Sequence, residues 1–143
     1  MKKYNKGYVA GVFDLFHVGH LNLLENSKNE CEYLIVGVLT DELVIHFKKK
    51  PPFIPFEERL RIIQSLRVVD EAVGVSFNNI AKMDAWNLYH FDCLFSGNDY
   101  INNPSWIADQ KRLNEVGSGI HFFPYTQGTS STYIKDLIMK SLV

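Results

Sequence analysis

The stretch "GVFDLFHVGH" at residues 11–20 decides how the rest of this sequence is interpreted. It begins as part of an apolar run and ends in two histidines three residues apart, His17 and His20. An apolar run that stops at polar residues is typical of a buried strand, and the next helix is predicted to begin about Val18 or Gly19. The two imidazoles are therefore expected where the strand ends and the helix begins.

Apolar runs and helical patterns alternate outward from this stretch along the chain. The predicted strands are residues 8–13, 33–39, 71–75, 93–97 and 120–124. The predicted helices are residues 21–30, 55–66, 80–90, 104–117 and 130–142. Near-continuous apolar runs are typical of strands covered on both faces. The alternation predicts an α/β fold, a Rossmann-like doubly wound sheet of about five parallel strands, in a single domain over residues 1–143.

The predicted sheet also indicates where a ligand binds. Ligands of such sheets bind beyond the carboxyl ends of the strands, near the point where the strand order reverses. The least regular stretch, "HFKKKPPFI" at residues 46–54, is predicted to be a mobile loop.

The composition is that of an ordinary globular protein and limits the possible functions. Of the 143 residues, 46% are hydrophobic and 22% are charged, and the net charge is −1. The chain therefore lacks the global positive charge of a nucleic-acid-binding protein. No apolar run approaches a membrane span, and no secretory signal is expected. Cys31 and Cys93 match no zinc spacing, so we expect a cytoplasmic protein with reduced thiols.

The histidine pair is a candidate phosphate site on physical grounds. A helix N-terminus attracts anions through its unpaired N–H groups, and two imidazoles add donors at the same place. Gly19 leaves room for a phosphate to approach the backbone. Two other interpretations stay open. In the first, His17 and His20 bind a metal, which their spacing allows, although no third ligand is nearby. In the second, they are surface residues at the start of a helix.

A second candidate phosphate site is the small-residue turn "TQGTSST" at residues 126–132, which precedes the last predicted helix. Hydroxyl and N–H groups in such a turn can hold phosphate oxygens. By itself the turn is also an ordinary N-cap, with Ser130 or Ser131 as the capping residue. Asp14, within an apolar stretch, is expected to orient the turn or a nearby cation rather than to act as a base.

These motifs together resemble a known family. "GVFDLFHVGH" resembles the first signature of the cytidylyltransferase branch of the nucleotidyltransferase superfamily, and "YTQGTSSTYI" at residues 125–134 resembles its second signature. The likeness continues in "YLIVGVLTDE", "FEERLRIIQSLRVVDEAV" and "FSGNDY". It covers nearly the whole chain in the same order.

The resemblance assigns roles by position. It implies that the catalytic residues are His17, His20, Lys50 and Arg67. It implies that the nucleotide-binding residues are Val12, Phe13, His17, Gly19, His20, Lys50, Asp99, Tyr125, Thr126, Gly128, Thr129, Ser130, Ser131 and Thr132. It implies that the acceptor is bound by Lys48, Arg59 and Lys82. For Arg67 a capping or surface role at a helix end stays open, and for Lys82 a solvated position on its helix.

Four positions depart from the family pattern. Val12 replaces a threonine, Asn98 and Tyr100 replace an aspartate and a tryptophan, and Tyr125 stands where the second signature carries arginine. The last change removes a fixed cation near the nucleotide. The departures bear on the identity of the base and of the acceptor, while the histidines, the lysine loop and the Ser/Thr turn are kept.

The implied reaction is transfer of CMP from CTP to a phosphorylated alcohol, with glycerol 3-phosphate favoured, giving a CDP-alcohol and pyrophosphate. The resemblance also implies Mg²⁺ bound with the triphosphate, and a homodimer. Three alternatives stay open: another phosphorylated alcohol or sugar alcohol as acceptor, ATP as donor, or a nucleotide-binding module without catalysis.

Overall fold

The computed structural model describes residues 2–124 and 130–142. In this part of the chain a single sheet is formed by β1 (Tyr4–Gly11), β2 (Cys31–Leu39), β3 (Glu71–Val75), β4 (Cys93–Gly97) and β5 (Ile120–Phe123). All neighbouring strands are parallel, in the order β3-β2-β1-β4-β5. The strand order reverses beside β1, so the predicted doubly wound α/β sheet is confirmed.

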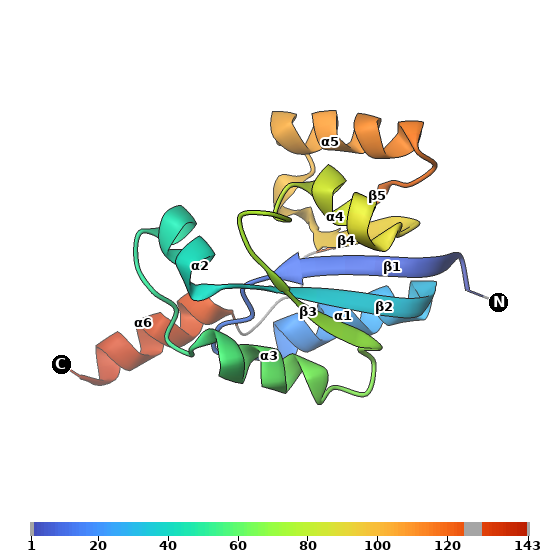
Figure 1. Cartoon of the computed structure of the whole chain (residues 1–143). Helices are drawn as coiled ribbons and strands as arrows, with labels where there is room; N and C mark the ends of the chain where they lie inside the picture. Colours follow the sequence, from blue (N-terminus) through green and yellow to red (C-terminus); the bar gives the residue numbers. More distant parts are fainter. Residues whose placement is uncertain (1, 125–129, 143) are drawn as a thin grey trace.

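The helices lie on both faces of the sheet and beyond one of its ends (Figure 1). They are α1 (Val18–Glu30), α2 (Asp41–Lys48), α3 (Phe56–Gln64), α4 (Lys82–Tyr89), α5 (Pro104–Glu115) and α6 (Ser131–Ser141), with a short 3₁₀ helix η1 (Asn98–Tyr100). In Figure 1, α1 and α3 cover one face, α4 and α5 cover the other, and α2 and α6 lie beyond the carboxyl ends of the strands. None of the described helices is both long and apolar enough to cross a membrane.

The two faces of the sheet explain the continuous apolar runs in the sequence. Val9 and Val36 pack with Leu24 of α1 in one buried cluster. Tyr8 packs with Leu113 of α5 in another, on the opposite face. Because successive strand residues point to opposite faces, both sets must be apolar.

The first strand ends earlier than predicted. The expected range was residues 8–13, but β1 ends at Gly11 because Phe13 and Leu15 have left-handed backbone angles, with φ of 54° and 51°. The chain therefore turns out of the sheet before the histidines. The strand also begins earlier, at Tyr4, which pairs with Cys31 at the start of β2.

The predicted loop over residues 46–54 is wrong in its first part, because α2 extends to Lys48. Thr40 caps this helix by accepting a hydrogen bond from the N–H of Leu43, at 3.4 Å. Asp41 and Glu42 in its first turn stabilise the helix, because their negative charges interact favourably with the positive end of the helix dipole. Lys49 ends it in a left-handed conformation, with φ of 63°. The irregular segment is therefore the short connection from Lys49 to Pro55.

Candidate active site

The candidate site lies where β1 and β4 separate at their carboxyl ends. β1 pairs with β2 along its whole length, but with β4 only at Gly7–Cys93 and Tyr8–Leu94. The gap beyond these pairs is the expected position for a ligand, because the strand order reverses there. Two cavities, of about 280 and 290 Å³, meet at this gap and share Leu23 in their walls.

We call the first cavity the histidine lobe. It is lined by His17, Gly19, His20, Leu23, Asn26, Gly97, Asp99, Phe123, Pro124, Ser130 and Ser131. The histidine signature and the serines at 130 and 131, more than 100 residues apart in sequence, therefore share one cavity, as the sequence predicts.

Hydrogen bonds within the first turn of α1 orient both imidazoles. The Nδ1 atom of His17 accepts from the N–H of Gly19 at 3.0 Å, and the Nδ1 atom of His20 accepts from the N–H of His17 at 3.2 Å. In a neutral imidazole, a nitrogen that accepts leaves the proton on the other nitrogen. Each ring therefore carries its proton on Nε2, which is the donor it can offer to a ligand. The rings are stacked, with centroids 3.9 Å apart.

Both imidazoles are neutral at pH 7. Burial lowers the pKa of His20 to about 4, with a further lowering from His17. Burial also lowers the pKa of His17. The site thus presents two fixed, uncharged donors rather than two imidazolium ions.

The second helix N-terminus at this lobe belongs to α6. Ser130 is its N-cap and accepts a hydrogen bond from the N–H of Tyr133 at 3.0 Å. The hydroxyl of Ser131 donates to the carbonyl oxygen of Asp14 at 2.9 Å, which joins α6 to the turn after β1. Two helix N-termini therefore face one cavity, an arrangement that suits a polyphosphate.

We call the second cavity the lysine lobe. It is lined by Tyr8, Val9, Ala10, Gly11, Val12, Leu23, Leu39, Lys48, Ile80, Lys82, Leu94, Phe95, Ser96, Tyr100 and Trp106. It brings together two lysines that the sequence assigned to the acceptor, one at the end of α2 and one at the start of α4.

Lys48 stands among charged groups near the junction of the two lobes. Partial burial lowers the pKa of its ammonium, and Lys135 of α6 lowers it further, while Asp14 acts in the opposite direction. Lys48 in turn contributes to the lowered pKa of His20. Lys135 is a cation that the sequence analysis missed, since nothing in a mid-helix lysine shows that its helix packs over the loop after α2.

Lys82 is not a solvated residue of its helix. Its side chain is 16% exposed, and its Nζ lies 3.1 Å from a carboxylate oxygen of Asp109. The same Nζ lies 3.7 Å from the centroid of the Trp106 ring. The Trp106 ring is stacked on Tyr100, with centroids 4.5 Å apart and planes 4° from parallel.

Asp14 orients the backbone, in agreement with its expected role. It is 5% exposed, and its carboxylate accepts hydrogen bonds from the N–H groups of Phe53 and Ile54, at 2.8 and 2.9 Å. A carboxylate held in this way fixes the connection after α2 rather than accepting a proton from substrate. It also places a negative charge beside Lys48.

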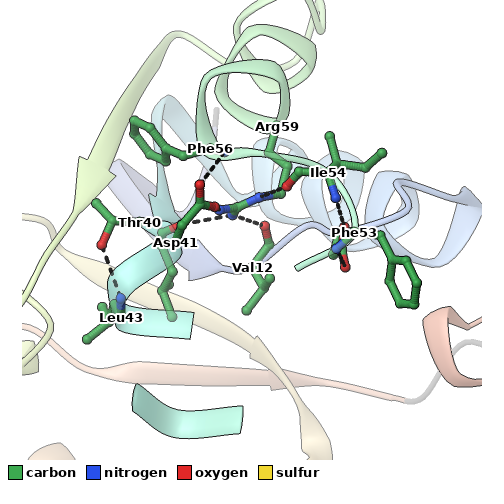
Figure 2. Close-up of polar contacts among 10 residues, drawn as sticks. Val12, Thr40, Asp41, Leu43, Phe53, Ile54, Phe56 and Arg59 are labelled. Carbon is green, nitrogen blue, oxygen red and sulfur yellow. Dashed lines mark hydrogen bonds and ion pairs between the residues drawn. The ribbon is translucent and has the colours of Figure 1, made fainter. Parts of the chain in front are cut away.

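Arg59 does not fit the predicted acceptor-binding role. Its side chain is fully buried, and its guanidinium donates to the carbonyl oxygens of Val12, Leu39 and Ile54 and pairs with Asp41 at 2.7 Å (Figure 2). A guanidinium committed to four acceptors inside the protein has no path to a ligand in this structure. We therefore assign Arg59 a structural role, as a brace between β1, β2 and α3.

Arg67 does not reach the site of its own chain either. It is exposed in the turn between α3 and β3, three residues before Asp70. Asp70 pairs with Lys28 in the last turn of α1, at 2.6 Å, whereas His17 caps the first turn. A helix of 13 residues is roughly 20 Å long, so Arg67 lies near the amino ends of the strands, at the opposite end of α1 from the histidines. The surface role is the one that this geometry supports.

The other predicted residues are dispersed. Lys50 is exposed and outside both lobes, Phe13 is 4% exposed within the core, and Thr132 is exposed in the first turn of α6. Val12 lines the lysine lobe rather than the histidine lobe. The predictions for Tyr125, Thr126, Gly128 and Thr129 lie outside the described residues.

The structure adds lining residues that sequence reasoning did not find. Asn26 lies two helical turns after the histidines, and Phe123 and Pro124 follow the last strand. Trp106 is the clearest omission, because it lies on a helix whose pattern indicates only packing. Among residues 2–124 and 130–142, no group of three or more His, Cys, Asp or Glu side chains forms a metal cage.

Comparisons with known proteins identify the family of this chain. The family model described as cytidylyltransferase-like matches residues 8–137. A glycerol-3-phosphate cytidylyltransferase of Bacillus subtilis (strain 168) is 32% identical over 128 residues, covering 90% of this chain and 92% of that protein. An ethanolamine-phosphate cytidylyltransferase of Arabidopsis thaliana is 30% identical over 130 residues, covering 89% of this chain and 30% of that protein.

Among solved structures, the lipopolysaccharide core biosynthesis protein from Thermoplasma volcanium GSS1 is similar, with a TM-score of 0.70 and 25% identity. The similarity covers 88% of this chain and 99% of that chain. Because the family match and the B. subtilis relative both span nearly the whole chain, this protein belongs to the cytidylyltransferase-like family and is a nucleotidyltransferase.

Proposed function

We propose that this chain transfers CMP from CTP to glycerol 3-phosphate, giving CDP-glycerol and pyrophosphate. One observation carries the proposal: two neutral Nε2–H donors and the N-terminus of α6 face one cavity, and a second cavity that shares Leu23 with it is lined by Lys48 and Lys82. The first cavity suits a nucleoside triphosphate, and the second suits a small anion.

The proposed step is a direct displacement at phosphorus. A phosphate oxygen of the acceptor attacks the α-phosphorus of CTP, a new P–O bond forms, and the bond to the β-phosphate oxygen breaks, so that pyrophosphate leaves with its electron pair. The second pKa of a phosphate monoester is about 6, so the nucleophile is already ionised at pH 7. The reaction therefore needs positioning and charge stabilisation rather than a general base.

The chain's own residues supply these two effects. His17 and His20 donate from Nε2 to oxygens on the α-phosphorus, where negative charge develops. Their Nδ1 hydrogen bonds hold the rings in place before substrate binds, so no reorganisation is needed in the transition state. Lys48, near the junction of the lobes, faces the acceptor phosphate, and Ser130 and Ser131 with the α6 N-terminus face the triphosphate.

We propose that Mg²⁺ enters as part of the substrate complex, bound to the triphosphate. A hard cation that keeps most of its ligands from phosphate and water needs few protein carboxylates. Asp99, which lines the histidine lobe, is the acid placed to approach it.

Pyrophosphate release tests the proposal directly. Each nucleoside triphosphate would be paired with a panel of phosphorylated alcohols and sugar alcohols, and the expected result is turnover with CTP and glycerol 3-phosphate. Turnover with ATP and not CTP would overturn the cytidylyl assignment, and the Asn98 and Tyr125 departures keep this alternative in the panel. Calorimetric CTP binding without turnover on any acceptor would favour a non-catalytic module.

We also propose a homodimer, on the family resemblance. α6 contains no buried residue and exposes Tyr133, Leu137, Ile138 and Met139, a surface of the kind that a partner subunit covers. Light scattering across a dilution series is expected to give twice the mass of the 143-residue chain. A monomeric mass at all concentrations would contradict it.

A further inference from the structure

The two lysines that line the lysine lobe have different surroundings. Lys48 lies near the histidine lobe, since it affects the pKa of His20. Lys82 lies at the start of α4, among Ile80, Trp106 and Tyr100. Given the proposed function, the acceptor's phosphate must face the α-phosphorus and hence Lys48. Lys82, the other lysine of the lobe, is then the cation left to face the far end of the acceptor.

Lys82 occupies the position where an ammonium group of a ligand would bind. An ammonium is bound over an aromatic face or beside a carboxylate. Here the lysine's own Nζ lies 3.7 Å from the Trp106 centroid and 3.1 Å from Asp109. Tyr100 stacks in parallel on the Trp106 ring, so both of its faces are covered.

The charge around this end is positive. None of the described residues that line the lysine lobe is acidic, whereas Lys48 and Lys82 both line it. Asp109 is shared between Lys82 and Arg112, at 3.1 and 3.2 Å, so two cations neutralise it. A second ammonium placed here would meet a like charge, while a hydroxyl oxygen would accept a hydrogen bond from Nζ.

We propose that Lys82, held on Trp106 by Asp109, makes this enzyme select acceptors whose far end is an uncharged polyol and reject acceptors that carry an ammonium group. The inference rests on the proposed function and makes it more specific. Lys82 acts in it as a specificity-determining residue. It separates this chain from activities of the kind named for its ethanolamine-phosphate relative.

The first test compares glycerol 3-phosphate with phosphoethanolamine on the unaltered protein. With CTP present, kcat/KM for glycerol 3-phosphate is expected to be at least roughly tenfold higher, a ratio of the size that one cation–aromatic contact provides. Calorimetry of each acceptor alone is expected to show tighter binding of glycerol 3-phosphate than of phosphoethanolamine. Equal or reversed preference would overturn the inference.

The second test changes Lys82 itself. Lys82→Met keeps the aliphatic stem but removes the ammonium from the Trp106 ring and the Asp109 carboxylate. The ratio of kcat/KM for glycerol 3-phosphate to kcat/KM for phosphoethanolamine is expected to fall by roughly tenfold. Lys82→Arg keeps the charge and is expected to retain most of the preference. Lys111→Met, the same change at an exposed position of α5 outside the lobe, is expected to leave the ratio unchanged.

The outcomes separate this inference from the proposed function. If Lys82→Met lowers kcat/KM for both acceptors by the same factor, Lys82 is structural and the inference fails. Turnover with CTP would still uphold the proposed function. If the protein turns over phosphoethanolamine preferentially, the chemistry stands and the selectivity fails. If CTP gives no turnover but calorimetry shows the binding preference and its loss in Lys82→Met, the function fails and the selectivity stands.

Discussion

The two lobes of the site are built by different kinds of interaction. In the histidine lobe, the imidazoles are oriented by hydrogen bonds to backbone groups two and three residues away, within one turn of α1. In the lysine lobe, two wall residues are held by a contact from a distant segment, because Arg59 donates to the carbonyl oxygens of Val12 and Leu39. Local bonds make rigid, neutral donors, whereas the long-range contacts place charged side chains on separate helices.

The difference matches what each lobe has to do. Charge that develops in the transition state is best met by donors that do not move or titrate. Charge that is already present on a substrate is met by cations, and their selectivity depends on what surrounds them. The predictions that follow test this division, beginning with the largest expected effect.

Removing either histidine is expected to have the largest effect. His17→Ala and His20→Ala should each lower kcat by about 10²–10³-fold, the usual effect of losing one preorganised donor. Steady-state kinetics with CTP and glycerol 3-phosphate measure it, with circular dichroism to confirm the fold. Near-normal rates in both variants would refute the roles of the imidazoles.

A matched variant separates catalysis from capping at the same position. His17→Asn keeps a good N-cap for α1, whereas His17→Ala loses it at a cost of about 1 kcal/mol in the free energy of unfolding. Both variants lack the Nε2–H donor. If His17→Asn restored activity together with stability, the imidazole would only be a cap.

The two arginines provide the second test, on the lysine-lobe side. Arg59→Met leaves three buried carbonyl oxygens and Asp41 without their donor, so we expect a loss of about 3–5 kcal/mol in the free energy of unfolding. Arg67→Met, at an exposed turn, is expected to cost less than about 0.5 kcal/mol. Urea denaturation measures both. Equal stabilities would show that Arg59 does not brace the lobe.

The neutral state of the histidine lobe predicts a dependence of stability on pH. His20 has a folded-state pKa of about 4, below the value of about 6.5 in the unfolded chain. As pH falls from 6.5 to 4, the unfolded chain binds a proton that the folded chain does not, so the free energy of unfolding decreases. Above pH 6.5 this contribution is constant.

Denaturation at a series of pH values measures this dependence. His20→Gln is expected to show a shallower slope between pH 4 and 6.5 than the unaltered protein, because one depressed titration is removed. An unchanged slope would mean that His20 is not held neutral, and the contrast between neutral and cationic lobes would be lost.

The smallest expected effect concerns the floor of the lysine lobe. Tyr8 is 2% exposed and stacks on Phe91, and its hydroxyl has no hydrogen-bond partner among the described residues. Tyr8→Phe removes this buried polar atom and is expected to raise the free energy of unfolding by about 1 kcal/mol. Thermal unfolding measures it. A clear destabilisation would show that the hydroxyl has a partner.

Sequence reasoning predicted the elements whose signals are local. β3 and β4 have the expected bounds, because short apolar runs between polar turns allow little choice. α2 was missed because its signals, Thr40 followed by Asp41 and Glu42, come directly after a long apolar run. The three lysines before Pro51 also favoured the prediction of a loop over residues 46–54. The roles of Arg59 and Arg67 were implied by the family resemblance alone, which carries no information about which side chain is buried.

The sequence by itself determined the class of the fold and the pair of imidazoles at the first helix, and its resemblance to the cytidylyltransferase family implied the nucleotidyl-transfer chemistry. The fold class follows from apolar periodicity, and the imidazoles belong to a motif whose hydrogen bonds span three residues. Only the tertiary structure decided that Arg59 is buried, that Arg67 lies near the amino ends of the strands, and that Lys82 is held between Trp106 and Asp109. Those outcomes depend on which helices pack beside one another, and pairing of groups tens of residues apart leaves no periodic signal in the chain.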